Sequence, residues 1–308
     1  MISVGDYWYA MEGDYAHQGY RGTAYAKFQP DGSIGAWTSA TDRTVDRFSY
    51  GIASAGEYIY LAGGQTAPYS HTSAVEYARV NSDGSLSAWQ STSALLHASD
   101  PTNNLVAFNG YLYTVGGYGA ERSVGYAKIR ADGSLDPWQE ASSLQVSHPY
   151  TMSFAKNGYI YVLGGQVNAY GTDIVERASI NADGTLGIWE YDTSLPEVRG
   201  NAGVVTMGND VYLLSGCAPP YGQTWYTSVV RSSILPDHTL SSWEYDESVI
   251  TARPASLANT WNEYVYFTGV WGQIEMSRVV PEPSTMVLLG TCVISMFAYV
   301  WRRQRHTM

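Results

Sequence analysis

The stretch GYIYVLGG at residues 158–165 decides the fold, because the chain repeats it. Aromatic and aliphatic side chains alternate in it as in a strand, the preceding Asn157-Gly158 pair is a tight-turn sequence, and a double glycine ends it. The related stretches are GDYWYAMEG (5–13), GEYIYLAGG (56–64), GYLYTVGG (110–117), NDVYLLSG (209–216) and NEYVYFTG (262–269). Six copies of one hairpin strand predict an array of repeats.

A second marker, a turn followed by tryptophan, lies between successive copies of the first. Its five copies are DGSIGAW (31–37), DGSLSAW (83–89), DGSLDPW (132–138), DGTLGIW (183–189) and DHTLSSW (237–243). A third strand such as VERASINADG (175–184) leads into this turn, and a fourth strand follows it. Four antiparallel strands about every 50 residues are typical of a β-propeller blade.

The two markers together resemble kelch repeats over residues 4–280, with drift at Ser215-Gly216, Thr268-Gly269 and His238. The resemblance implies an all-β, kelch-like β-propeller of six blades. Residue 5 opens on a second strand and the last copy ends after a third strand, so we expect the first and last blades to be incomplete. MISVGDY at the start has no signal-peptide pattern. We therefore hypothesise that the natural product begins roughly 50 residues earlier, with a signal peptide and the missing strands.

The C-terminal tail carries the one apolar segment long enough to suggest a membrane helix. Residues 284–301 have no charge, and as a helix they would cover about 27 Å, close to the thickness of a hydrocarbon core. Arg302, Arg303 and Arg305 follow in the basic tail 302–308, and basic flanks favour the cytoplasmic side. We predict a transmembrane helix with its C-terminus inside and residues 1–280 outside.

Pro281, Glu282 and Pro283 precede this segment, so residues 280–308 resemble the PEP-CTERM sorting signal. The resemblance implies two parts, a propeller (1–280) and a sorting signal (281–308). It also implies that an exosortase cuts near the tripeptide. A membrane-anchored precursor would then give a mature form at the cell surface or in the extracellular matrix.

The composition of residues 1–280, called the body below, limits the classes of partner that it can bind. Residues 1–280 hold 14 lysines and arginines against 27 aspartates and glutamates, which argues against nucleic acid. Cys217 is the one cysteine of the body and Cys292 falls in the apolar tail, so no intradomain disulfide and no cysteine metal cluster is expected. The Asp-Gly pairs lack the ligand spacing of a calcium loop and are read as hairpin turns. No cofactor or metal is predicted.

Basic residues recur about ten positions after the marker tryptophans, where each innermost strand begins. They are Arg47, His148, Arg199 and Arg253, with His97 offset by two. One per blade would form a ring at the mouth of the channel, where guanidinium groups suit carboxylates or acidic sugars. The alternative is that each pairs with a neighbouring acid, such as Asp46 or Glu197, and only ties the blades together.

Aromatic residues also recur. The five marker tryptophans are expected to pack between blades. A second set follows the glycine ends of successive blades and could stack on sugar rings: Tyr69, Tyr118, Tyr170, Tyr221 and Trp271.

These observations favour an exported, noncatalytic propeller that binds extracellular polysaccharide or a surface protein. The alternative is a carbohydrate-active enzyme, of mutarotase, epimerase or lyase type, that acts at the channel mouth with histidine as acid or base. The repeat also resembles sialic-acid mutarotases, whereas the six scattered histidines do not match the copper site of galactose oxidase. Fold alone supplies no activity.

Overall fold

In the computed structural model, residues 1–277 form one compact unit and residues 278–308 a second. The structure describes residues 1–11, 21–66, 70–101, 104–167, 170–218, 224–248, 257–268 and 274–278. Within these ranges the chain is all-β, and its main sheets are six antiparallel blades in chain order. The six-bladed propeller predicted from the repeats is confirmed.

In each blade the strands follow one another outward, from an innermost strand at the centre of the ring to an outermost one. The innermost strands are β1 (Ile2–Val4), β5 (Gly51–Ala55), β11 (Leu105–Phe108), β15 (Met152–Lys156), β21 (Gly203–Met207) and β27 (Leu257–Trp261). The second strands are β2 (Tyr7–Met11), β6 (Tyr58–Ala62), β12 (Tyr111–Val115), β16 (Tyr159–Leu163), β22 (Asp210–Leu214) and β28 (Tyr264–Thr268). The third strands are β3 (Thr23–Lys27), β9 (Val75–Arg79), β13 (Val124–Lys128), β19 (Val175–Ser179), β25 (Ser228–Ser233) and β29 (Ile274–Arg278). The fourth strands are β4 (Thr38–Ser39), β10 (Gln90–Ser91), β14 (Gln139–Glu140), β20 (Glu190–Tyr191) and β26 (Glu244–Ser248).

Short ribbons extend the connection between the second and third strands in three blades. They are β7 (Gln65–Thr66) with β8 (Ser70–His71), β17 (Gln166–Val167) with β18 (Tyr170–Gly171), and β23 (Cys217–Ala218) with β24 (Thr224–Trp225).

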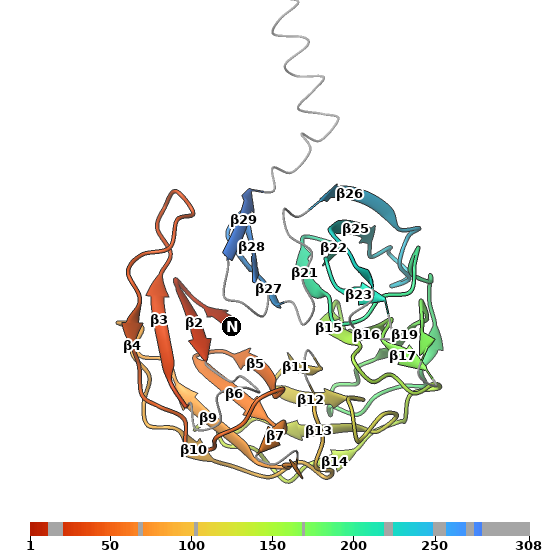
Figure 1. Cartoon of the computed structure of the whole chain (residues 1–308). Coiled ribbons are helices and arrows are strands. Elements are labelled where there is room, and N and C mark those ends of the chain that lie inside the picture. The colour runs from red at the N-terminus through yellow and green to blue at the C-terminus, as the bar shows by residue number, and fades with distance from the viewer. Residues whose placement is uncertain are drawn as a thin grey trace, which may run out of the picture. The chain divides into compact units, whose positions relative to one another are not determined.

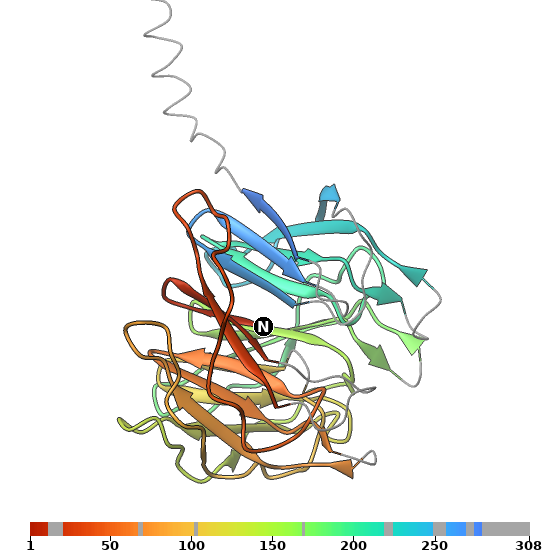
Figure 2. The ribbon, with the colours of Figure 1, turned by 60° about the vertical axis from the view of Figure 1, so that its left-hand side comes forward.

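The propeller closes into a ring. Each innermost strand contacts the innermost strand of the next blade, and β27 of blade 6 contacts β1 of blade 1 (Figure 1). At this junction the amide of Ser3 donates to the Asn259 side chain at 3.2 Å, and the Ser3 hydroxyl donates to the Thr260 carbonyl at 3.3 Å. Figure 2 shows blade 1, in red, beside blade 6, in blue. Side-chain hydrogen bonds therefore join the first blade to the last.

The expectation that the first blade is incomplete was wrong. β1 pairs with β2 through Ile2–Tyr9, Ser3–Trp8 and Val4–Tyr7, and blade 1 has four strands. Three residues before the Gly5-Asp6 turn are too few to show alternation, so the sequence pattern did not reveal this strand. In blade 6 the described residues form three strands.

Tyrosine hydroxyls on the second strands bind five of the six blades to the turn of the next. The Tyr60 hydroxyl donates to the Gly133 carbonyl at 2.8 Å, and the same bond recurs around the ring. The other pairs are Tyr9 with Gly84, Tyr113 with Gly184, Tyr161 with His238 and Tyr266 with Gly32. Gly133 has a φ of 82°, and a Cβ there would meet the Tyr58 ring at 2.4 Å, which explains the glycine of the turn.

Four of the five marker tryptophans join blades, as the sequence predicts. The Nε1 of each of these four donates to a carbonyl of the preceding blade or its connecting loop. The pairs are Trp89 with Thr41, Trp138 with Ser93, Trp189 with Ser142 and Trp243 with Thr193. Trp37, the fifth, is 41% exposed and packs against Trp8 of its own blade, with ring centroids 6.1 Å apart, so the predicted packing between blades is not seen there.

Replacing Tyr60 with phenylalanine should lower the free energy of unfolding by about 1 kcal/mol, because the variant loses one buried hydrogen bond and leaves the Gly133 carbonyl without a donor. Urea denaturation followed by tryptophan fluorescence measures the change. Tyr58→Phe, on the same strand but partly exposed, is the control and should change stability less. Equal effects of both substitutions would contradict the assigned role.

The predicted membrane segment (284–301) and the basic residues Arg302, Arg303 and Arg305 lie outside the described residues. Among the residues that the structure describes, no helix has the length and apolar character to cross a bilayer.

Candidate functional site

Arg47 lies on the loop four residues before the innermost strand of blade 2 and is buried, with 1% of its surface exposed. Its guanidinium donates to Glu76 Oε1 on β9 at 2.8 Å and to the carbonyls of Gly63 and Ala74 at 3.1 and 2.5 Å. Burial lowers the pKa of Arg47, and the Glu76 carboxylate opposes that shift. Arg47 thus fastens the loop between blades 1 and 2 to the body of blade 2.

His148 and Arg199 occupy the same place in blades 4 and 5, and neither is exposed. The two ring nitrogens of His148 lie 3.0 Å from Glu176 Oε1 and 2.7 Å from the Gly164 carbonyl. Arg199 donates to the Glu197 carboxylate and, at 2.7 Å, to the Ser215 carbonyl. In all three blades the basic side chain pairs with an acid of the protein. The sequence alternative named Glu197 and Asp46 as such acids. Glu197 does pair with Arg199, whereas Arg47 pairs with Glu76 and not with Asp46. Arg253 lies outside the described residues.

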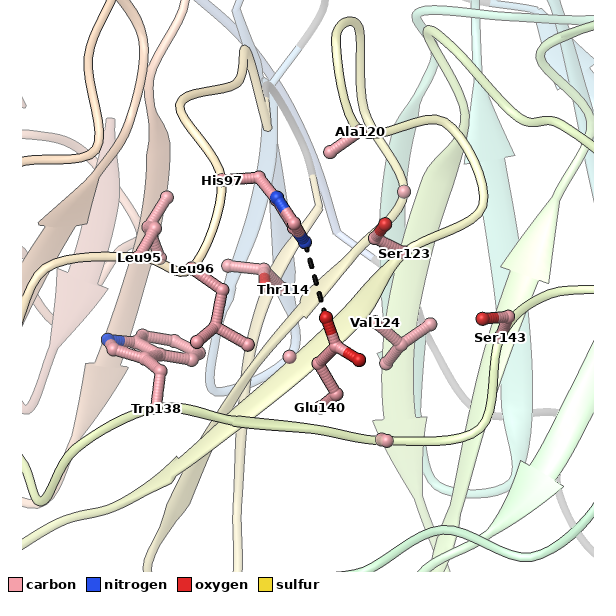
Figure 3. Close-up of a pocket in the computed structure, with 13 residues that line it drawn as sticks. Leu95, Leu96, His97, Thr114, Ala120, Ser123, Val124, Trp138, Glu140 and Ser143 are labelled. Carbon is pink, nitrogen blue, oxygen red and sulfur yellow. Dashed lines mark ion pairs between the residues drawn. The ribbon is translucent and has the colours of Figure 1, made fainter.

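His97 differs from these three residues, because about half of its side chain is exposed and it lines a cavity. Its Nε2 lies 3.5 Å from the Glu140 carboxylate on β14, and Figure 3 shows the two side chains pointing toward each other. The cavity has a volume of about 350 Å³, within the usual range of small-molecule sites. Hydroxyls of Thr114, Ser123 and Ser143 belong to its lining, and the Trp138 side chain lies on another wall.

The cavity exists because blade 3 lacks a buried ion pair that its neighbours have. Gly125 on β13 pairs with Thr114, at the place where Glu76 pairs with Leu61 in blade 2 and Glu176 pairs with Val162 in blade 4. Ser99 stands ten residues after the marker tryptophan, where the neighbours have Arg47 and His148. Blade 3 therefore lacks both the glutamate and the basic residue of the ion pair, and the cavity lies beside Gly125.

Aromatic side chains lie near the cavity. Tyr118 is 45% exposed; its ring stands edge-on to His71 at 5.6 Å and lies 5.8 Å from the Tyr150 ring. Gly119 connects Tyr118 to Ala120, which lines the cavity. Tyr170, 75% exposed, lies on β18, in the ribbon between the second and third strands of blade 4. The other predicted stacking residues, Tyr69, Tyr221 and Trp271, lie outside the described residues.

Sequence reasoning missed Glu140, His71 and Tyr150. Glu140 had a usable signal, since it follows Trp138 by two residues and therefore pairs across β14 with Gly125. His71 and Tyr150 had none, because they come from different blades and meet only in the folded ring.

The Asp-Gly pairs form hairpin turns, as the sequence predicts. Asp132 accepts hydrogen bonds from the Ser134 amide at 3.0 Å and hydroxyl at 2.6 Å, and these bonds lower the pKa of its carboxyl group. Cys217 is buried, which raises the pKa of its thiol to about 11. Within the described ranges no group of three or more histidine, cysteine, aspartate or glutamate residues could hold a metal ion.

Comparisons with known proteins match the propeller and the C-terminal tail separately. Residues 279–304 match the PEP-CTERM protein-sorting motif, which implies processing by an exosortase and an exported, membrane-anchored precursor. The propeller is similar to the solved structure of YjhT, with 11% identity and a TM-score of 0.67 over 91% of this chain and 94% of that chain. At this identity the likeness concerns the fold alone. No curated protein matches the sequence.

The fold and the motif together define the class: a six-bladed β-propeller that carries a C-terminal PEP-CTERM sorting motif.

Proposed function

We propose that the protein is a noncatalytic propeller displayed at the cell surface, where it binds extracellular polysaccharide through the face of blade 3 that carries the cavity and Tyr118. The kelch-type assignment, the membrane helix at 284–301 and cutting near Pro281-Glu282-Pro283 belong to the same proposal. The PEP-CTERM motif supports export. A surface protein as partner is an outcome that the experiment below distinguishes.

One observation carries the binding proposal: a cavity of about 350 Å³ lined by hydroxyl groups, a histidine and a carboxylate, with an exposed tyrosine close by. Hydroxyl-rich sugars are bound by such polar side chains, and aromatic faces supply apolar contact area at low entropic cost.

The enzyme alternative is less well supported. It placed its chemistry on Arg47, His148, Arg199 and Arg253. The first three are buried, and each is hydrogen-bonded to a carboxylate of the protein. A general acid or base needs hydrogen-bond access to substrate, which these three side chains do not offer. Noncatalytic binding therefore remains the preferred function.

Tyr118→Ala should weaken polysaccharide retention about tenfold, equivalent to about 1.4 kcal/mol, because it removes an exposed ring that lies two residues before Ala120 of the cavity lining. The measurement is retention of the full-length protein on immobilised acidic and neutral polysaccharides. Tyr191→Ala, on the exposed fourth strand of blade 4, is the matched control. Failure of the unaltered protein to bind any polysaccharide while it captures a surface protein would contradict the proposal.

A further inference from the structure

In blades 2 and 4 the repeat builds a seat for a carboxylate, between the connecting loop and the third strand. In blade 4, Glu176 accepts hydrogen bonds from the Gln145 amide at 2.8 Å and the Val146 amide at 3.0 Å. In blade 2, Glu76 accepts from the amide and hydroxyl of Thr44 at 3.0 and 2.5 Å. Thr44 and Gln145 both follow a marker tryptophan by seven residues. A carboxylate held by two or three such donors is strongly bound.

Blade 5 lacks the glutamate and compensates for its loss. Val230, fully buried, stands at the position of Glu76 and Glu176. The loop residue at the seventh position is Pro196, which has no amide hydrogen to satisfy. Glu197, the next residue, supplies the carboxylate that pairs with Arg199. Blade 5 therefore removes one donor and fills the space.

Blade 3 does neither. Its seventh and eighth loop positions are Leu96 and His97, both with amide hydrogens, and both residues line the cavity beside Gly125. Within the described part of the chain, neither amide donates a hydrogen bond to the protein. An amide hydrogen without a partner is costly unless water or a ligand bonds to it.

We propose that the blade 3 cavity is a binding site for the carboxylate of an acidic sugar, a hexuronate unit, which takes the place that the glutamate side chain occupies in blades 2 and 4. The Leu96 and His97 amides would hold the carboxylate, and the His97 ring adds a donor at the same edge. Ring hydroxyls of the sugar face Thr114, Ser123, Ser143 and the Glu140 carboxylate. The choice of a sugar rests on the proposed function.

Two variants that copy neighbouring blades test this proposal. Thr114→Val with Gly125→Glu recreates the Val162–Glu176 pair of blade 4, so that the protein's own carboxylate fills the seat. Leu96→Pro copies the Leu195-Pro196 sequence of blade 5 and removes one amide donor while leaving the cavity open. Ser39→Glu adds the same charge on the exposed fourth strand of blade 1 and serves as the control.

Calorimetric titration of the full-length protein with D-galacturonate, and with D-galactose as the neutral match, gives the readout. We expect galacturonate to bind at least tenfold more tightly than galactose. Both copying variants should lose at least tenfold of the galacturonate affinity. The double variant should still unfold cooperatively, at a lower temperature than the unaltered protein, because its new carboxylate faces Glu140 across the strands and has Ser99 in place of a base. Loss of galacturonate binding in a variant that still unfolds cooperatively separates an occupied seat from a folding defect. Equal binding of the two sugars, or galacturonate affinity unchanged in both variants, would overturn the proposal.

The same variants separate this inference from the proposed function. If polysaccharide is retained but the double variant retains it equally, the surface function stands and the carboxylate site does not. If galacturonate binds in the cavity but no polysaccharide is retained, the carboxylate site stands and the polysaccharide function fails.

Discussion

Replacing Arg47 with alanine should lower the free energy of unfolding by about 3–5 kcal/mol, the usual cost of removing one partner of a buried ion pair. Glu76 would stay buried without its cation, and the Gly63 and Ala74 carbonyls would lose a donor. Urea denaturation of the full-length protein measures the change. The loop between blades 1 and 2 should also exchange its amide hydrogens faster, because the variant loses the bonds that join Arg47 to the body of blade 2.

The matched control is Arg79→Ala. Arg79 pairs with Glu57 at 2.9 Å, but both side chains are more than half exposed, so the change should stay within about 0.5 kcal/mol. If Arg47→Ala were no more costly than Arg79→Ala, Arg47 would not be the structural anchor described above, and a ligand-binding role for it would regain support.

Replacing Glu176 with glycine should open a second cavity, in blade 4, and lower the free energy of unfolding by about 3–5 kcal/mol. The variant leaves the Gln145 and Val146 amides and the buried His148 ring without their shared acceptor. Because the lost group is a carboxylate, added acetate should restore part of the stability. At an acetate concentration ten times its dissociation constant the recovery is about 1.4 kcal/mol.

Thermal denaturation with sodium acetate and with sodium chloride at the same ionic strength tests this rescue. The Tyr60→Phe variant is the control, since it should be destabilised without gaining an anion site. Identical responses to acetate and chloride in Glu176→Gly would show that the loop amides do not make a seat for a free carboxylate.

The repeats made the fold predictable because every blade solves the same packing problem. Tyr60 and its counterparts alternate with aliphatic residues in the second strand, and the tryptophans recur at one blade position, so periodicity alone indicated their packing. β1 escaped prediction because three residues are too few to show a pattern.

Only part of the candidate site could be predicted, because the cavity arises where blade 3 lacks the glutamate and the basic residue that blades 2 and 4 have. The basic residues Arg47, His148 and Arg199 were found by their spacing. For Arg47 and His148, the distance to an acid on a third strand, which makes them structural, depends on strand register. His97 was predicted as a member of this set although it is offset by two positions. The offset marks a different place in the blade, because His97 is not equivalent to Arg47 but lies on the loop that lines the cavity. The absence of a glutamate at Gly125 became meaningful only once the registers were aligned.

The most direct test of the carboxylate site is an amide titration of Leu96 and His97. Full-length protein labelled with nitrogen-15 at leucine and histidine is titrated with D-galacturonate, and amide chemical shifts are followed by nuclear magnetic resonance. A carboxylate in the seat predicts large downfield shifts of the Leu96 and His97 amide protons that saturate, with little change at Leu195 and His148 in the occupied loops of blades 5 and 4. Saturable binding of galacturonate without movement of the Leu96 and His97 signals would contradict the proposed site.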